Sequence, residues 1–145
     1  MKYNKVEQGI FQKRPNRFIA HVEINGKEEV CHVKNTGRCR ELLVPGALVF
    51  LEESDNPKRK TKYDLIAVEK GNRLINMDSQ IPNKVVEEWL KEGNLFGKEA
   101  KVRREVVYGN SRFDLYIESG ERKIFMEVKG VTLEENNVVR FPDAP

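Results

Sequence analysis

The sequence has few cysteines and no long apolar run, and these absences exclude several classes of protein. Only Cys31 and Cys39 occur among 145 residues, too few for a disulfide scaffold, so we expect a reducing, cytoplasmic setting. No apolar stretch approaches the roughly 18 residues that a membrane-spanning helix needs. The polar N-terminus leads into no apolar signal-peptide core. The sequence therefore predicts a soluble cytoplasmic protein without a membrane partner.

Several catalytic motifs are also missing. There is no glycine-rich phosphate loop, which argues against hydrolysis of nucleoside triphosphates. The sequence has no C-x₂-C pair, so a zinc site built from His21, Cys31, His32 and Cys39 receives little support. Neither histidine has an evident serine or cysteine partner for nucleophilic catalysis. What remains for chemistry is a set of carboxylates and basic side chains.

Basic residues gather in the first half of the chain. The whole chain carries 26 lysines and arginines against 23 acidic residues, but residues 1–80 hold 15 against 11. Three clusters in this half predict an anionic partner such as a nucleic acid, which would be bound through its phosphates and without sequence specificity. The candidate contacts are Arg14, Arg17, His32, Lys34, Asn35, Arg38, Arg40, Lys58, Arg59, Lys60 and Lys62.

Short strands are predicted throughout residues 1–80. Residues 18–24 alternate between apolar and polar side chains, and Asn25-Gly26 is a strong hairpin signal before the next strand. The other predicted strands cover 29–33, 47–51, 64–68 and 73–77. Strands of this length with a turn about every ten residues indicate a small antiparallel barrel.

From Pro82 the apolar period changes to that of a helix. We expect Asn83 to cap this helix and Gly93 to end it, with Trp89 as an anchor in the core. The apolar face comprises Val85, Val86, Trp89 and Leu90. Three further strands are predicted over 100–108, 111–117 and 122–128. This pattern indicates a second, α/β domain over residues 81–145.

Two of the later strands carry acidic residues at related positions. Alternation places Arg112, Asp114 and Tyr116 on one face, opposite Phe113, Leu115 and Ile117. A turn centred on Ser119-Gly120 pairs Asp114 with Phe125 and leaves Glu127 diagonal to Asp114, about 7–8 Å away at the backbone. Two carboxylates at that separation can converge on one cation.

The preceding turn adds a third carboxylate. If Gly109-Asn110 is a two-residue turn, Glu105 lies directly opposite Asp114, where like charges destabilise a strand pair unless a cation offsets them. We therefore interpret Asp114 and Glu127 as ligands of Mg²⁺ or Mn²⁺. The candidate catalytic residues are Asp114, Glu127, Lys129 and Glu105, with Lys129 orienting water or stabilising developing charge. The alternative is an exposed sheet face of charged side chains.

Several motifs together resemble the sugar fermentation stimulation protein family. They are Asn35-Thr36-Gly37-Arg38, Glu41-Leu42-Leu43-Val44-Pro45-Gly46, Asn56-Pro57-Lys58-Arg59-Lys60-Thr61-Lys62-Tyr63, Tyr108-Gly109-Asn110-Ser111-Arg112-Phe113-Asp114, Glu127-Val128-Lys129 and Phe141-Pro142-Asp143-Ala144. The resemblance implies an N-terminal OB-fold domain, a PD-(D/E)XK nuclease-like domain and binding to DNA. It matches Asp114, Glu127 and Lys129 to the nuclease motif, and the family name implies a link to the regulation of sugar-utilisation genes.

Members of this family continue beyond the Phe141–Ala144 motif with a further helix and strand, whereas this sequence ends at Pro145. The expected fold class is therefore α+β, with an OB-fold-like barrel over 1–80 and a truncated α/β PD-(D/E)XK nuclease-like domain over 81–145. The expected function is DNA binding with a metal-dependent nuclease-like site. A non-catalytic DNA-binding transcriptional regulator, an RNA-binding OB module and a homo-oligomer stay open.

Overall fold

The computed structural model describes residues 1–141, so the Pro142-Asp143-Ala144 part of the last motif lies outside the described residues. The chain forms two compact units. The barrel unit comprises Lys2–Ser79 and the segment that starts at Val131. The helix–sheet unit comprises Gln80–Gly130, together with Met1. The predicted domain boundary at residue 80 stays a prediction, although the segment after Gly130 packs within the barrel unit.

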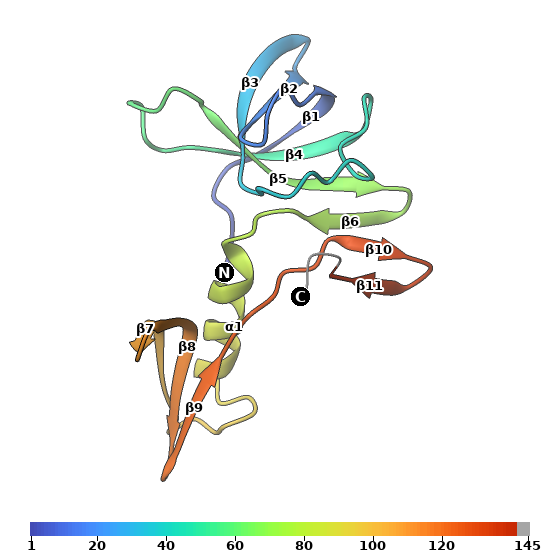
Figure 1. Cartoon of the computed structure of the whole chain (residues 1–145). Coiled ribbons are helices and arrows are strands. Elements are labelled where there is room, and N and C mark those ends of the chain that lie inside the picture. The colour runs from blue at the N-terminus through green and yellow to red at the C-terminus, as the bar shows by residue number, and fades with distance from the viewer. Residues whose placement is uncertain (142–145) are drawn as a thin grey trace. The chain divides into compact units, whose positions relative to one another are not determined.

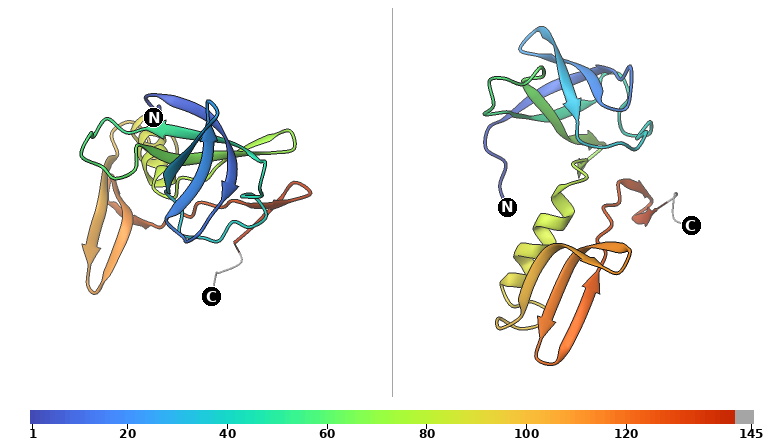
Figure 2. Two further views of the ribbon diagram at one scale, coloured as in Figure 1. Left: turned by 90° about the horizontal axis from the view of Figure 1, so that it is seen from above. Right: turned by 60° about the vertical axis from the view of Figure 1, so that its left-hand side comes forward.

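The barrel unit contains a sheet that closes on itself (Figures 1 and 2). Its strands are β1 (Val6–Lys13), β2 (Ile19–Ile24), β3 (Lys27–Val33), β4 (Leu48–Glu53), β5 (Tyr63–Lys70) and β6 (Arg73–Asn76). They lie in the order β3-β2-β1-β4-β5-β6, and β3 also pairs with β5. The predicted barrel is confirmed. The expectation of antiparallel pairing throughout is wrong at the closure, where His32 and Val33 pair in parallel with Asp64 and Leu65.

Strand β1 was not expected from the sequence, although it belongs to the barrel wall. The burial of Val6–Lys13 alternates, but its apolar residues do not, since Val6 and Ile10 lie on the exposed face while Gly9 and Phe11 are buried. A Cβ atom at Gly9 would lie 2.5 Å from Val22 Cγ1, so glycine allows β1 to approach β2 closely. An isolated glycine within a strand often marks such an approach.

Strand β6, expected as a barrel strand, instead extends the sheet at its edge.

The helix–sheet unit begins with helix α1 (Ile81–Lys91). Pro82 lies in its first turn, where a missing N–H costs nothing, so the helix starts earlier than expected and Asn83 is not its cap. Gly93, with φ 92°, follows the end as predicted and donates its N–H to Leu90 O at 3.0 Å. Trp89 as a core anchor is wrong: it is 44% exposed, whereas Leu90 is 1% exposed.

Three antiparallel strands pack against α1, and they confirm the predicted strands. They are β7 (Lys101–Tyr108), β8 (Ser111–Ser119) and β9 (Arg122–Met126), with β8 in the middle. The fully buried core of this unit is Leu90, Leu115 and Ile117. This architecture is an α+β arrangement, and its nuclease-like character stays a prediction.

A hairpin of β10 (Leu133–Glu135) and β11 (Val138–Arg140) completes the barrel unit. Asn136 and Asn137 form its turn with positive φ values of 54° and 65°, a conformation that asparagine tolerates well. The hairpin lies beside the β5–β6 edge, where Lys70 Nζ donates to Glu134 O at 2.9 Å (Figure 1). Among the described residues, no helix has the length and apolar character to span a membrane.

Candidate functional site

The turn between β7 and β8 has the expected form, but the expected contact of Glu105 is interrupted. Gly109 and Asn110 form the two-residue turn, and Arg104 pairs with Leu115 in the predicted register. Glu105 itself adopts a φ of 57° and is missing from the ladder between Arg104 and Val106. Its carboxylate forms an ion pair with Arg112 instead of facing Asp114.

The register between β8 and β9 differs from the prediction by two residues. Gly120 and Glu121 form the turn, with Gly120 at φ 60°, so the turn lies one residue later than Ser119-Gly120. Phe125 consequently pairs with Tyr116 rather than Asp114, and the last pair is Leu115 with Met126. One further step in this register brings Glu127 directly opposite Asp114. Glu127 itself follows the end of β9, so this position extends the register by one residue beyond the observed pairs.

Asp114 points toward α1, which corrects the predicted face. Its Oδ1 accepts a hydrogen bond from Asn83 Nδ2 at 2.8 Å, and its Oδ2 accepts one from the Val128 N–H at 2.8 Å. The centre of the Phe113 ring lies 4.8 Å from that of the Phe125 ring, on the other side of the sheet. Strict alternation thus fails at Phe113 and Asp114, opposite the irregular residue of β7.

Glu127 and Lys129 lie in the exposed segment after β9 and contact each other. Lys129 Nζ donates to Glu127 Oε1 at 2.8 Å, and this hydrogen bond raises the pKa of Lys129 above its usual value. The described residues contain no cluster of three metal-ligating side chains. Asp114 and Glu127 nevertheless fit Mg²⁺ or Mn²⁺, which are often held by one or two carboxylates while waters and substrate phosphates complete the coordination.

Arg14, a predicted phosphate contact, is used within the protein. Its guanidinium donates to four carbonyl oxygens, those of Arg17 and Asn35 at 2.6 Å, Gly37 at 2.7 Å and Arg38 at 2.8 Å. The loop between β1 and β2 and the loop after β3 are thereby tied together. Burial lowers the pKa of Arg14, which still stays charged. Arg14 therefore organises the basic loops, and its contact with phosphate stays a prediction.

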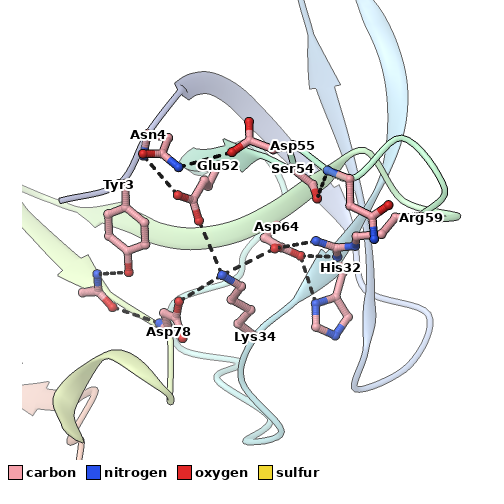
Figure 3. Close-up of polar contacts among 12 residues, drawn as sticks. Tyr3, Asn4, His32, Lys34, Glu52, Ser54, Asp55, Arg59, Asp64 and Asp78 are labelled. Atoms are coloured by element: carbon pink, nitrogen blue, oxygen red, sulfur yellow. Dashed lines mark hydrogen bonds and ion pairs between the residues drawn. The ribbon is translucent and has the colours of Figure 1, made fainter. Parts of the chain in front are cut away.

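Arg59 is likewise paired internally, with the buried carboxylate of Asp64 (Figure 3). Its NH1 and NH2 groups donate to Asp64 at 2.8 and 2.6 Å, a bidentate arrangement, and His32 Nδ1 lies 3.1 Å from the same carboxylate. Burial alone would raise the pKa of Asp64, but the hydrogen bonds from Arg59 and the charge of Lys34 outweigh it and lower that pKa. This pair fixes the loop between β4 and β5 to the start of β5.

Lys34 lies among three carboxylates at the end of β3 (Figure 3). Its Nζ is 3.5 Å from Glu52 Oε2, 3.4 Å from Asp64 Oδ2 and 3.4 Å from Asp78 Oδ2. Desolvation alone would lower the pKa of Lys34, but the three carboxylates together outweigh it and raise that pKa above its usual value. The ammonium form is therefore retained. Asn35 is also engaged, because its Nδ2 donates to Met77 O at 2.9 Å. Both predicted phosphate contacts thus serve the barrel.

The remaining basic candidates form what we call the free cations. They are Arg17, Arg38, Arg40, Lys58 and Lys60, all exposed and without a carboxylate partner within residues 1–141. Lys62 differs, since its Nζ lies 3.2 Å from Glu53 Oε1 and 4.9 Å from the centre of the Tyr63 ring. Whether the free cations contact phosphate stays a prediction, but they are the members of the predicted set whose charge is unneutralised.

Asp64, Asp78 and Glu52 were not expected from the sequence to take part in the site. The sequence did carry a signal for Asp64, because this aspartate lies inside the apolar run Tyr63–Val68. In the structure it is buried, at 4% exposure. A buried carboxylate requires a partner. The identity of that partner depends on pairing between distant strands, which the sequence does not reveal.

Comparison with known proteins follows this two-part organisation. A family model described as the SfsA N-terminal OB domain matches residues 13–77, and one described as the sugar fermentation stimulation protein RE domain matches residues 80–145. Proteins named sugar fermentation stimulation protein homolog from Ruminiclostridium cellulolyticum and Desulfitobacterium hafniense are 65% and 66% identical over the whole chain. The chain spans 64% and 63% of their respective lengths.

A solved structure shows the same similarity. It is the structure of Pyrococcus furiosus SfsA in complex with Ca²⁺, and it aligns with a TM-score of 0.86 at 30% identity, covering 100% of this chain and 63% of its own. The two family models together leave few residues unmatched. The chain belongs to the sugar fermentation stimulation protein family.

Proposed function

We propose that the barrel unit binds DNA through the phosphates, with the free cations as its contacts. The observation that carries the proposal is that their charges, unlike those of Arg14, Lys34 and Arg59, are unneutralised within residues 1–141. OB folds bind oligonucleotides on the β2–β3 face and through the loops between strands 1 and 2 and between strands 4 and 5. Arg17 lies in the first of these loops, and Lys58 and Lys60 lie in the second.

The strand pairing supports a shared surface for these loops. Ile19 pairs with His32, which brings the loop before β2 to the end of β3. His32 also pairs with Asp64, which brings the loop before β5 to the same end. The loop that carries Arg38 and Arg40 follows β3 directly. Because phosphate contacts carry no base information, we expect binding with little dependence on sequence.

Fluorescence anisotropy with labelled DNA tests this proposal. Arg38→Gln combined with Arg40→Gln should weaken binding to unrelated sequences by a similar factor, because two phosphate contacts are lost. Arg38→Lys with Arg40→Lys should retain most of the affinity. Lys27→Gln, an exposed lysine at the opposite end of β3, is the control and should change little. Full affinity of the double glutamine variant would contradict the proposal, and tighter binding of RNA than of DNA would favour the RNA-binding alternative.

A metal-dependent nuclease-like site is a second proposed function, favoured by the register that brings Glu127 opposite Asp114. The similar Pyrococcus furiosus protein was solved in complex with Ca²⁺, which supports binding of a divalent cation by this chain. Asp114 and Glu127 would hold Mg²⁺ or Mn²⁺, which polarises a scissile phosphate and lowers the pKa of a bound water. Lys129 would orient that water or stabilise charge on the phosphate.

Nicking of a supercoiled plasmid in Mn²⁺ tests the second function. Lys129→Ala should abolish nicking while metal binding persists, and Asp114→Asn should remove both. If neither this chain nor a version extended to the length of its relatives nicks the DNA that it binds, the non-catalytic DNA-binding regulator is favoured. The link to sugar-utilisation genes stays a proposal from the family name and needs a test in cells.

A further inference from the structure

Phe18 is an aromatic side chain of the barrel unit that the fold leaves exposed. It is 55% exposed, whereas Phe11 and Tyr63 of the same unit are 2% and 7% exposed. Single exposed apolar residues are common on protein surfaces and carry no meaning by themselves. Two features of its setting distinguish Phe18: its backbone is held by hydrogen bonds, and two free cations lie in the adjoining loops.

The backbone of Phe18 is held at both of its polar groups. Its N–H donates to Asn16 Oδ1 at 2.9 Å, and its carbonyl accepts from the Val33 N–H at 2.7 Å. The next residue, Ile19, also donates its N–H to Asn16 Oδ1, at 3.1 Å. Phe18 is thus presented to solvent from a fixed position at the start of β2, and its exposure is not that of a loose loop.

Two of the free cations belong to the loops that meet next to this position. Arg17 precedes Phe18, and the carbonyls of Arg17 and Arg38 both accept hydrogen bonds from the guanidinium of Arg14, at 2.6 and 2.8 Å. The backbones of two free cations are therefore tied together by one internal arginine, next to an aromatic residue whose backbone is also held. An aromatic ring beside cations is the combination that binds single-stranded nucleic acid, since bases stack on the ring while phosphates pair with the cations.

We infer that Phe18 stacks on an unpaired base and that the ligand of this surface is single-stranded nucleic acid. This inference rests on the proposed function, since Arg17 and Arg38 would hold the flanking phosphates. Bases in an intact duplex are stacked on each other, so their faces are closed to a protein side chain. Charge alone would bind either form, and Phe18 supplies the preference for the single strand.

The test compares Phe18→Ala with the parent chain on a labelled strand of about 12 nucleotides. Loss of one stacked base should weaken binding by about 5- to 150-fold. Phe18→Tyr should restore affinity, because the tyrosine ring also stacks. The salt dependence should be the same in all three proteins, since no phosphate contact changes. Circular dichroism melts should show that the exposed substitution leaves the fold intact.

An abasic strand with the same number of phosphates separates base contacts from phosphate contacts. The parent should bind the abasic strand more weakly than the normal strand, and Phe18→Ala should bind the two nearly equally. Equal binding of Phe18→Ala and the parent, or a preference of the parent for duplex, would overturn the stacking inference while the proposed DNA binding stands. If the parent binds no nucleic acid of either form, the proposed function itself fails.

Discussion

The two units of the chain treat their charged residues in opposite ways. In the barrel unit, Asp64 and Asp78 are buried at 4% and 2% exposure, and the Lys34 ammonium lies between them. In the helix–sheet unit, Glu127 and Lys129 are exposed and form an ion pair with each other. Buried ions hold the barrel together, and exposed ions are available for a ligand. A basic cluster in a sequence therefore mixes structural and functional cations.

Removing the buried ammonium should have the largest effect. Lys34→Met leaves three carboxylates facing each other, and we expect it to cost about 3 kcal/mol, the lower end of the range for a broken buried pair. The lower end applies because 20% of the Lys34 side chain is exposed. Lys60→Met, at an exposed lysine without a carboxylate partner within residues 1–141, should cost less than about 0.5 kcal/mol. Urea unfolding measures both, and equal losses would show that the internal pairing contributes nothing.

A divalent cation should stabilise the helix–sheet unit to a similar extent. Mn²⁺ at a hundredfold excess over its dissociation constant should add about 2.7 kcal/mol by mass action. Asp114→Asn should abolish this gain, whereas Glu121→Gln, in the exposed turn of the same sheet, should keep it. Thermal melts with and without the ion provide the measurement. A melting temperature of the parent that does not move in millimolar Mn²⁺ would exclude the metal site.

The internal role of Arg14 should be visible in a charge-conserving change. Lysine keeps the positive charge but cannot reach four carbonyl oxygens in the planar geometry of a guanidinium, so Arg14→Lys should cost about 2 kcal/mol. Arg17→Lys, at an exposed free cation, should leave the unfolding free energy unchanged. Thermal unfolding separates the two. If Arg14→Lys is as harmless as Arg17→Lys, Arg14 is not the organiser of these loops.

The lowered pKa of Asp64 predicts a smaller, pH-dependent effect. Since the folded state favours the carboxylate form, the stabilisation is complete above the unfolded pKa near 4 and is lost as the pH falls through the lower pKa of the folded state. Asp64→Asn should be less stable than the parent at neutral pH and should lose less stability on acidification. Parallel pH profiles of the two proteins, measured by urea midpoints, would contradict the ion-pair account.

Trp89 should show the smallest effect. Trp89→Ala is expected to change the unfolding free energy by no more than about 0.5 kcal/mol, because the side chain is 44% exposed. Leu90→Ala, one residue further along α1 and 1% exposed, should cost about 2–5 kcal/mol. A loss at Trp89 as large as that at Leu90 would restore the sequence-based interpretation of Trp89 as a core residue.

Much of the architecture could be predicted from local patterns. The alternation of residues 18–24 and the Asn25-Gly26 turn located β2 and β3, and Gly109-Asn110 located the turn before β8. Strand β1 escaped prediction because Gly9 has meaning only beside Val22, a contact between strands. The turn after β8 was displaced by one residue, since Ser119-Gly120 and Gly120-Glu121 both suit a hairpin and local sequence does not choose between them.

The site was harder to predict than the fold, because charges can be counted in a sequence but not paired. Lys34 meets carboxylates from β4, from β5 and from the segment after β6, and only closure of the barrel brings these together. Arg14 looks identical to Arg17 in the sequence, yet one donates to four carbonyls and the other is exposed. The face of the sheet on which Asp114 lies was also mispredicted. Across the ladder from it, Glu105 has a positive φ of 57° and interrupts the pairing, which the sequence does not reveal.

The salt dependence of binding tests most directly whether free and internal cations differ as described. Each phosphate contact with single-stranded DNA contributes about −0.7 to the slope of log K against log salt. Five free cations therefore predict a slope of about −3.5, and Arg38→Gln with Arg40→Gln predicts about −2. A slope near −3.5 for the parent and a slope near −2 for the double variant would support the account. A slope that is unchanged in the double variant, or a slope near zero in the parent, would contradict it.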